Sequence, residues 1–325
     1  MKKVFVLGGL GFLGRYTVLE LVNKGYEVHA ISLPPAPAEG LVPDSVKIEL
    51  LDMFSLSDDD IIKMLDGVYA FFYAAGVDER ITPPIPASKF FYEKNVLPTQ
   101  RLARLAKKAG VKKFILYGSY TAHFAELWSD INYRTVNGYP RTRLLQEEVA
   151  YLEGGQGMDV MTLRLPYIFG TMPGVMPLWA MFVEQIRDKE VFYAPMGGTA
   201  MVTVEQVAQA AVGAMEHGAH ETPYALGGEN MKYVKFYQII AEQLGQQTQI
   251  IPVPLENMLP QMKQIDEQTQ AQGVEHGIHM EYTAIFQDRD AYIEPSKVMD
   301  ELKYQPMDVE TSIRKTIDKC VSAKL

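Results

Sequence analysis

Short apolar runs alternate with amphipathic stretches along the first half of the chain. The short runs are apolar at consecutive positions, which is typical of strands that helices cover on both faces. Alternation of such strands with helices predicts an α/β fold with a doubly wound parallel sheet. The expected strands are residues 4–7, 27–32, 46–51, 69–74, 113–117 and 159–163. The expected helices are residues 11–24, 58–65, 96–109 and 141–153.

The alternation of short apolar runs with amphipathic stretches becomes irregular after Pro166. Prolines, glycines and methionines crowd residues 166–201, and a polar, glutamine-rich stretch covers residues 246–272. We therefore expect the sheet domain to occupy residues 1–166 and a smaller, less regular C-terminal lobe to occupy residues 167–325. Helical periodicity places a segment of that lobe, at about 201–228, back on the sheet.

Composition narrows the class of protein. The 325 residues carry a formal net charge of −9, which argues against nucleic acid or an anionic membrane as the main partner. Cys320 is the only cysteine, so an intramolecular disulfide framework and a cysteine-based zinc site are excluded. No apolar run is long enough to span a bilayer, and the N-terminal run is interrupted by glycine. We expect a soluble, cytoplasmic protein with a small-molecule ligand.

The segment VFVLGGLGFLGRYTVLELVNKG places a strand, a glycine-rich turn and an amphipathic helix in succession. A turn this tight needs residues that tolerate positive φ, and a pyrophosphate approaches the backbone only where no Cβ intervenes. The helix that follows offers free N–H groups and a positive dipole end to phosphate. The strand before and the helix after favour a dinucleotide-binding turn over a tight turn that binds nothing. Its expected contact residues are Gly8, Gly9, Leu10, Gly11, Phe12, Leu13 and Gly14.

Further motifs follow in an order that resembles the extended short-chain dehydrogenase/reductase family, including its NAD-dependent epimerase/dehydratase group. They are Leu51-Asp52, FFYAAGV, KNVLPTQRLARLAKKAGVKKFIL, LRLPYIFG, TVEQVAQA and PSKVMDELKYQP. The resemblance covers most of the chain and fades between about Gly245 and Arg289. It implies a Rossmann domain, a substrate-binding lobe and a homodimer. It also implies cofactor contacts from Asp52, Met53, Ala74, Ala75, Gly76, Asn95, Pro166 and Ile168.

The resemblance also implies a site for hydride transfer. In this family a Ser or Thr holds the substrate oxygen, a Tyr transfers the proton, and a Lys four residues on lowers the pKa of that Tyr and holds the ribose. Ser119 and Tyr139 stand at the first two positions, but Arg143 replaces the Lys. The (i, i+4) spacing keeps a cation on the helix face of the phenol. A guanidinium does not deprotonate, so Arg143 cannot serve in a proton relay.

Three interpretations of the site stay open. The first is an NAD(P)-dependent oxidoreductase that interconverts a hydroxyl and a carbonyl. The second is an epimerase or dehydratase with a tightly held cofactor, and the third is a non-catalytic NAD(P)-binding regulatory protein. The run TMPGVMPLWAMF after the expected nicotinamide loop either lines a pocket for a small to medium, largely apolar substrate or packs in the core, and both interpretations stay open. The histidine pair His276 and His279 lacks a recognisable third ligand, so we expect no metal.

The end of the second strand bears on the choice of nicotinamide. NAD users carry an Asp or Glu there, which hydrogen-bonds the ribose 2′-OH. This chain has Ser32 at that position, and Arg15 directly after the glycine turn is the nearest candidate cation for a 2′-phosphate. The sequence therefore favours NADP over NAD, while a solvated helix-surface role for Arg15 stays open.

Overall fold

Seven parallel strands form the main sheet, in the order β10-β6-β5-β4-β1-β2-β3. The computed structural model describes residues 1–322. The strands are β1 (Lys3–Leu7), β2 (Glu27–Ser32), β3 (Lys47–Leu50), β4 (Val68–Tyr73), β5 (Lys113–Ser119), β6 (Asp159–Leu165) and β10 (Thr222–Ala225). This arrangement confirms the predicted doubly wound parallel sheet.

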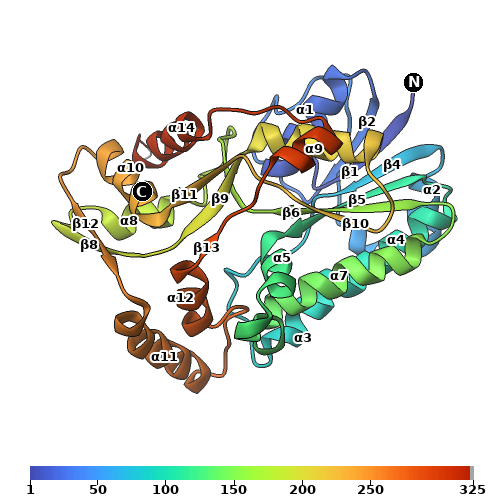
Figure 1. Ribbon diagram of the computed structural model, residues 1–325. Helices are drawn as coiled ribbons and strands as arrows, with labels where there is room; N and C mark the ends of the chain where they lie inside the picture. Colours follow the sequence, from blue (N-terminus) through green and yellow to red (C-terminus); the bar gives the residue numbers. More distant parts are fainter. Residues whose placement is uncertain (323–325) are drawn as a thin grey trace.

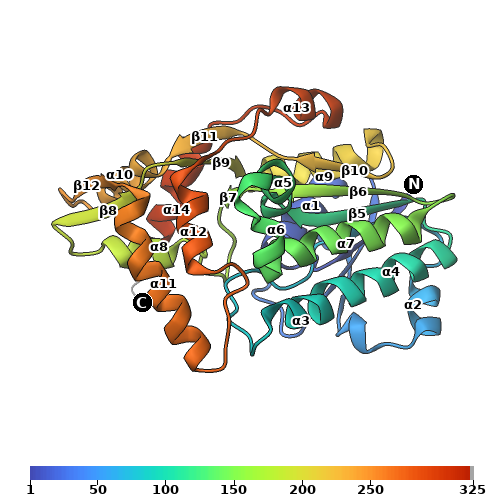
Figure 2. The same ribbon diagram turned by 60° about the horizontal axis from the view of Figure 1, so that its bottom comes forward.

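Helices cover both faces of this sheet (Figures 1 and 2). One face carries α1 (Phe12–Asn23), α9 (Val204–His217) and α13 (Ser296–Leu302). The other carries α2 (Asp58–Met64), α3 (Ala87–Phe91), α4 (Leu97–Lys108) and α7 (Gly138–Gly154), with the short α5 (Tyr120–Leu127) and α6 (Tyr133–Val136) beside the start of α7. Successive side chains of a strand point to opposite faces, so Val4 packs toward α1 while Phe5 packs toward α4. Burial on both faces explains why central strands such as β1 and β4 are continuously apolar, whereas the edge strand β3 is mostly exposed.

The remaining elements form a smaller lobe on the left of Figure 1. They are β7 (Tyr167–Phe169), α8 (Ala180–Ile186), β8 (Val191–Pro195), β9 (Gly198–Thr203), β11 (Glu229–Lys232), α10 (Tyr233–Gln243), β12 (Gln249–Val253), α11 (Leu255–Ala271), α12 (Met280–Asp288), β13 (Asp290–Ala291) and α14 (Val309–Ser322). β9 pairs with β7, β11 and β13, and β8 pairs with β12. The last three residues of the expected lobe, 323–325, lie outside the described residues.

Two segments differ from the irregular structure that we expected for this lobe. Residues 255–271 of the polar stretch form the 17-residue helix α11, and residues 280–288 form α12. Glutamine, glutamate and methionine are good helix formers, and α11 packs against α12. Local propensity therefore produces a helix where the hydrophobic pattern was too weak to predict one. The segment expected to return to the sheet supplies α9 and β10.

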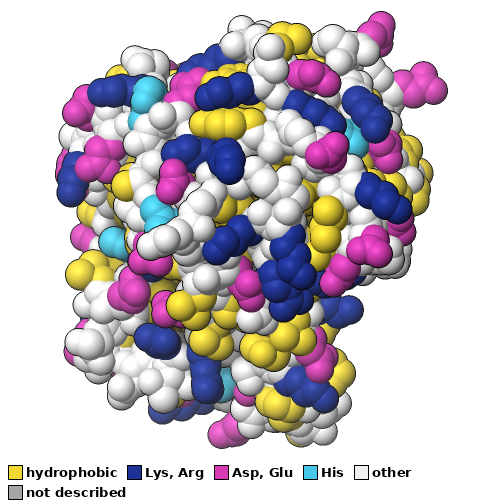
Figure 3. All heavy atoms as spheres, turned by 90° about the vertical axis from the view of Figure 1, so that its right-hand side faces the viewer, with side chains coloured by type: hydrophobic (Ala, Val, Ile, Leu, Met, Phe, Trp, Pro, Cys, Tyr) yellow, Lys and Arg dark blue, Asp and Glu magenta, His cyan; other side chains and the backbone are white. Residues whose placement is uncertain are grey.

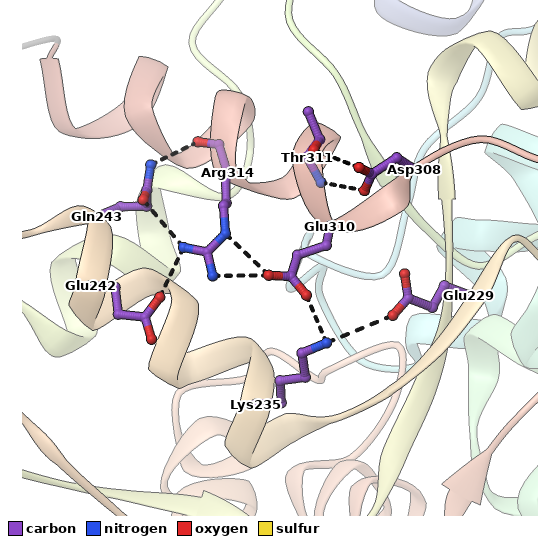
Figure 4. A network of polar contacts seen from close by, with 8 residues as sticks. All are labelled: Glu229, Lys235, Glu242, Gln243, Asp308, Glu310, Thr311 and Arg314. Atoms are coloured by element: carbon purple, nitrogen blue, oxygen red, sulfur yellow. Dashed lines mark hydrogen bonds and ion pairs between the residues drawn. The ribbon is translucent and has the colours of Figure 1, made fainter.

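A network of charged side chains joins α10 to α14 (Figure 4). Arg314 contacts Glu310 at 2.9 Å and Glu242 at 2.8 Å, and Lys235 contacts Glu310 at 2.7 Å. These groups are partly exposed, so the network adds little to stability beyond the apolar packing beneath it. The network links α14 to α10 within the small lobe.

The amino-terminal ends of the sheet strands face away from the small lobe. This face carries Lys, Arg, Asp and Glu side chains intermixed with apolar ones (Figure 3). Lys113 and Asp159, at the starts of β5 and β6, pair there at 2.8 Å. Ligands of open parallel sheets bind at the opposite, carboxyl edge, which here faces the small lobe.

No helix within residues 1–322 is long and apolar enough to cross a membrane. The same residues contain no group of three or more His, Cys, Asp or Glu side chains placed to hold a metal ion.

A buried ion pair ties α7 to the sheet. Arg164 on β6 donates to Glu147 on α7 from Nε at 3.1 Å and from Nη2 at 2.6 Å, and both side chains are at most 5% exposed. Arg164→Met would leave the Glu147 carboxylate buried without its partner. We expect the free energy of unfolding to fall by about 3–5 kcal/mol, measured by urea denaturation. Arg187→Met, which breaks an exposed pair with Glu184, should change it by less than about 1 kcal/mol. Equal effects of the two substitutions would contradict this prediction.

Candidate active site

The glycine-rich turn joins β1 to α1 at the carboxyl edge of the sheet. Gly8 adopts φ +82°, and a Cβ at Gly14 would overlap the carbonyl oxygen of Gly8. Both Gly8 N and Gly9 N donate to the Ile31 carbonyl, at 2.8 and 3.0 Å. Gly11 is the N-cap residue of α1 and offers no side-chain cap, so the first N–H groups of the helix stay free to bind an anion.

Ser32 and Arg15 flank this turn. The Ser32 hydroxyl accepts a hydrogen bond from Leu10 N at 2.8 Å, so it supports the turn from the end of β2. Arg15 Nε donates to the Leu41 carbonyl at 2.8 Å, which places the guanidinium against the loop that follows β2. Phe12 lies near Gly170, on the opposite side of the turn, and Leu13 is half-buried.

The end of β4 forms the next part of the carboxyl edge of the sheet. Ala74 and Ala75 are half-buried, and Gly76 adopts φ +139°. The fully buried Asn95 holds the next residue, Val77, because its Oδ1 accepts from Val77 N and its Nδ2 donates to Val77 O, both at 2.9 Å. The Asn95 amide thus fixes the backbone of this loop.

Asp52 and Met53 follow the β3 strand. Asp52 Oδ1 accepts from Phe54 N at 3.0 Å and caps a short 3-10 turn. The Met53 side chain is 1% exposed and packs in the apolar core beneath the sheet.

Ser119, Tyr139 and Arg143 meet beside β5. Ser119 is the last residue of β5, and its hydroxyl lies 2.9 Å from Thr121 Oγ1. Tyr139 and Arg143 lie one turn apart on α7 and are 4% and 6% exposed. The Arg143 guanidinium carbon is 5.7 Å from the centre of the Tyr139 ring, and its Nη2 donates to the Tyr117 carbonyl on β5. The cation thus stays near the phenol and is anchored to the sheet.

The pKa of Tyr139 is set by opposing effects. Burial raises it well above its ordinary value, and Arg143 lowers it. The carboxylates of Glu79 and Asp78 raise this pKa further, whereas the nearby Ser119 hydroxyl lowers it. At neutral pH the phenol is therefore protonated.

Glu79 is a charged residue near the site that the sequence did not indicate. It lies in the loop after β4, where Asp78 and Arg80 pair with each other. The Glu79 side chain reaches solvent, yet the protein around it desolvates the carboxylate and raises its pKa. Its charge also raises the pKa of Tyr120 and Tyr133. No local pattern marks this residue, because its neighbours in space come from distant segments.

The segment after β6 lies on the other side of the turn. Pro166 is buried, and the Ile168 carbonyl accepts from Trp179 Nε1 at 2.9 Å. Beyond it, Gly174 contacts the loop after β2 so closely that a Cβ there would overlap the Pro37 carbonyl oxygen. The loops after β2 and β7 therefore touch each other.

The residues at this edge suit a dinucleotide. The turn leaves no room for a Cβ at Gly8 or Gly14, so α1 packs closely on the end of β1, and Gly11 leaves the start of the helix open to a pyrophosphate. Arg143 Nε is buried and has no hydrogen-bond partner in the described part of the chain. A ribose hydroxyl would supply the missing acceptor.

Comparison with known proteins agrees with this geometry. The chain is 28% identical to the sterol-4-alpha-carboxylate 3-dehydrogenase, decarboxylating, of Bos taurus over 242 residues, which is 70% of this chain and 64% of that protein. The match thus spans less than two thirds of that relative. Identity to the UDP-glucose 4-epimerase of Bacillus subtilis is 26% over 162 residues, covering 45% of this chain and 46% of the epimerase.

Solved structures share the fold. The crystal structure of gox2253 superposes with a TM-score of 0.77 at 20% identity, covering 98% of this chain and 97% of that one. The UDP-glucuronic acid 4-epimerase of Bacillus cereus, in complex with NAD, gives a TM-score of 0.70 at 13% identity, with 98% of each chain covered.

The family profile of the NAD dependent epimerase/dehydratase family matches residues 4–227. This range includes the glycine turn, all of the parallel sheet except Lys3, and Ser119, Tyr139 and Arg143. The expected resemblance is confirmed, and the chain belongs to the NAD dependent epimerase/dehydratase family of enzymes.

Proposed function

We propose that this enzyme is an NAD(P)-dependent oxidoreductase that interconverts a hydroxyl and a carbonyl on a small to medium, largely apolar substrate. The meeting of Ser119, Tyr139 and Arg143 beside the glycine turn carries the proposal. A bound nicotinamide supplies or accepts the hydride at the substrate carbon. In the reducing direction, Tyr139 donates its proton to the carbonyl oxygen and Ser119 holds that oxygen by a hydrogen bond.

Arg143 supports this proton transfer electrostatically. Its positive charge stabilises the phenolate that forms when Tyr139 gives up its proton. The guanidinium remains charged throughout, so the proton returns to Tyr139 from solvent rather than through Arg143. Its unpartnered Nε is the group we assign to the ribose.

Two contacts favour a second candidate, an epimerase or dehydratase that retains its cofactor. The loop that contains Pro37 touches the loop that contains Gly174, and Tyr16 on α1 donates to the Thr171 carbonyl at 2.7 Å. Such a closed arrangement would slow the release of a bound dinucleotide. Cofactor that survives purification, together with no net reduction of ketones, would favour this candidate.

Tyr139→Phe tests the proton-transfer role. We expect kcat for a panel of cyclic and aryl alkyl ketones to fall by about 10²- to 10⁴-fold, because the proton donor is lost. Affinity for NADH and NADPH, followed by nicotinamide fluorescence, should stay unchanged. Tyr69→Phe, at the far end of β4, is the matched control. Full activity of Tyr139→Phe would exclude the mechanism.

Glu79→Gln tests the electrostatics of the site. Removing this negative charge stabilises the phenolate, so the pKa of Tyr139 should fall and its titration should move to lower pH. The change is measured as tyrosinate absorbance, after subtraction of the same titration for Tyr139→Phe. Glu93→Gln removes an exposed carboxylate paired with Lys89 and should leave the titration where it is. An unshifted curve in Glu79→Gln would place Glu79 too far from the phenol to act on it.

For the cofactor we propose a preference for NADP(H), in which Arg15 contacts the 2′-phosphate. The absence of a carboxylate at Ser32 and the position of the guanidinium beside Leu41 support this preference. The charge-assisted bonds of Arg15 to phosphate should make NADPH the tighter ligand.

Arg15→Ala should weaken NADPH binding by about 10- to 100-fold and change NADH binding little, because only NADPH carries the 2′-phosphate. Parallel fluorescence titrations of the two dinucleotides measure both effects. Arg104→Ala, on the exposed side of α4, is the control. Tighter binding of NADH by the unaltered enzyme would contradict the preference.

A further inference from the structure

Residues Gly273–His279, the link between α11 and α12, reach out of the small lobe and contact the helices beside the active site (Figure 2). We name this segment the clasp. Ile85 N donates to Gly273 O at 3.2 Å, and Glu275 N donates to Pro83 O at 2.9 Å. The clasp thus pairs with the segment that leads into α3. It lies beyond residue 227, where the family match ends.

The clasp supplies a cap that α7 itself lacks. The first N–H groups of a helix have no partner within the helix, and the Asn137 side chain does not cap α7. Tyr139 N instead donates to the carbonyl oxygen of Gly277 at 2.8 Å. Asn137 Oδ1 accepts from His279 N at 2.9 Å, so the start of α7 and the clasp hold each other.

Packing makes Gly277 necessary at this position. A Cβ there would lie 2.5 Å from the Phe91 ring and 3.1 Å from Tyr139 Cβ. The Phe91 and Tyr139 rings pack edge to face at 5.3 Å, and all of these groups are buried around the clasp. A larger residue would push the two rings apart.

Glu275 holds the clasp to α3. Its Oε2 accepts from Ala87 N, the first amide of α3, at 2.6 Å. Its Oε1 lies 3.1 Å from His279 Nε2. On the other side, Asp266 of α11 accepts from Met280 N at 2.8 Å, so the clasp is fixed at both ends.

From these contacts we propose that Gly277 is a positioning residue, through which the small lobe sets the place of the Tyr139 side chain. The inference rests on the proposed role of Tyr139 in proton transfer. Gly277 touches the backbone and Cβ of this residue rather than any reacting atom. The lobe expected to hold the substrate therefore also holds the start of the helix that presents the phenol.

Gly277→Ala is the test. We expect kcat to fall about 10- to 100-fold, with KM and dinucleotide affinity unchanged. A displacement of the Tyr139 phenol by about 1 Å is enough for such a loss. Gly245→Ala is the control for a general loss of stability, since Gly245 also lies in the small lobe, its φ of +70° strains an alanine, and no atom lies within 4 Å of the added Cβ. Loss of kcat in Gly277→Ala alone supports the proposal, and equal kcat in the two variants overturns it.

A second readout does not depend on turnover, so it separates this inference from the proposed reaction. Loosening the clasp exposes Tyr139, and burial is the largest cause of its raised pKa. Its tyrosinate titration, taken as the difference from Tyr139→Phe, should move to lower pH in Gly277→Ala and stay in place in Gly245→Ala. An unmoved titration in Gly277→Ala overturns the inference even if no ketone is ever reduced.

Glu275 provides a milder variant in case Gly277→Ala does not fold. Glu275→Ala removes the acceptor of Ala87 N and should shift the Tyr139 titration in the same direction by a smaller amount. Glu275→Gln keeps an amide oxygen at that place and should restore the original titration. Identical titrations for all three proteins would overturn the role of the clasp.

Discussion

The close packing of Gly14 on the Gly8 carbonyl is the constraint that determines the structure of the carboxyl edge of the sheet. It allows α1 to start directly above the end of β1, so that its free N–H groups face the same side as the ends of β4 and β5. Gly8 in turn lies against the Ala74 carbonyl, and Ser32 supports Leu10 from the end of β2. A side chain at Gly8 or Gly14 would push α1 away from the ends of the strands and disrupt the site.

Much of this edge could be predicted from the sequence, because its signals are local. The glycine spacing, the continuous apolar strands and the (i, i+4) pair of Tyr139 and Arg143 each occupy one short stretch of chain. Glu79 and the clasp could not be predicted, because they act through neighbours far away in the sequence. Gly277 meets Tyr139 across 138 positions, and nothing around it forms a motif.

Two residues that the sequence assigns to the cofactor also hold the backbone of the site. The Asn95 amide hydrogen-bonds both backbone groups of Val77, and Asp52 Oδ1 caps its own turn. Spacing shows that a polar residue is needed at such a place, but it does not tell whether the ligand or the backbone takes its hydrogen bonds. Only the three-dimensional course of the loop decides between them.

The clasp has a consequence for how this chain can vary. Residues 245–289, where the family resemblance fades, contain the segment that caps α7. An exchange of this region with that of a relative would replace the segment whose Gly277 carbonyl accepts from the Tyr139 amide. In the proposed mechanism, proton delivery therefore depends on this region, and a hybrid protein needs a compatible α3, α7 and clasp from one parent.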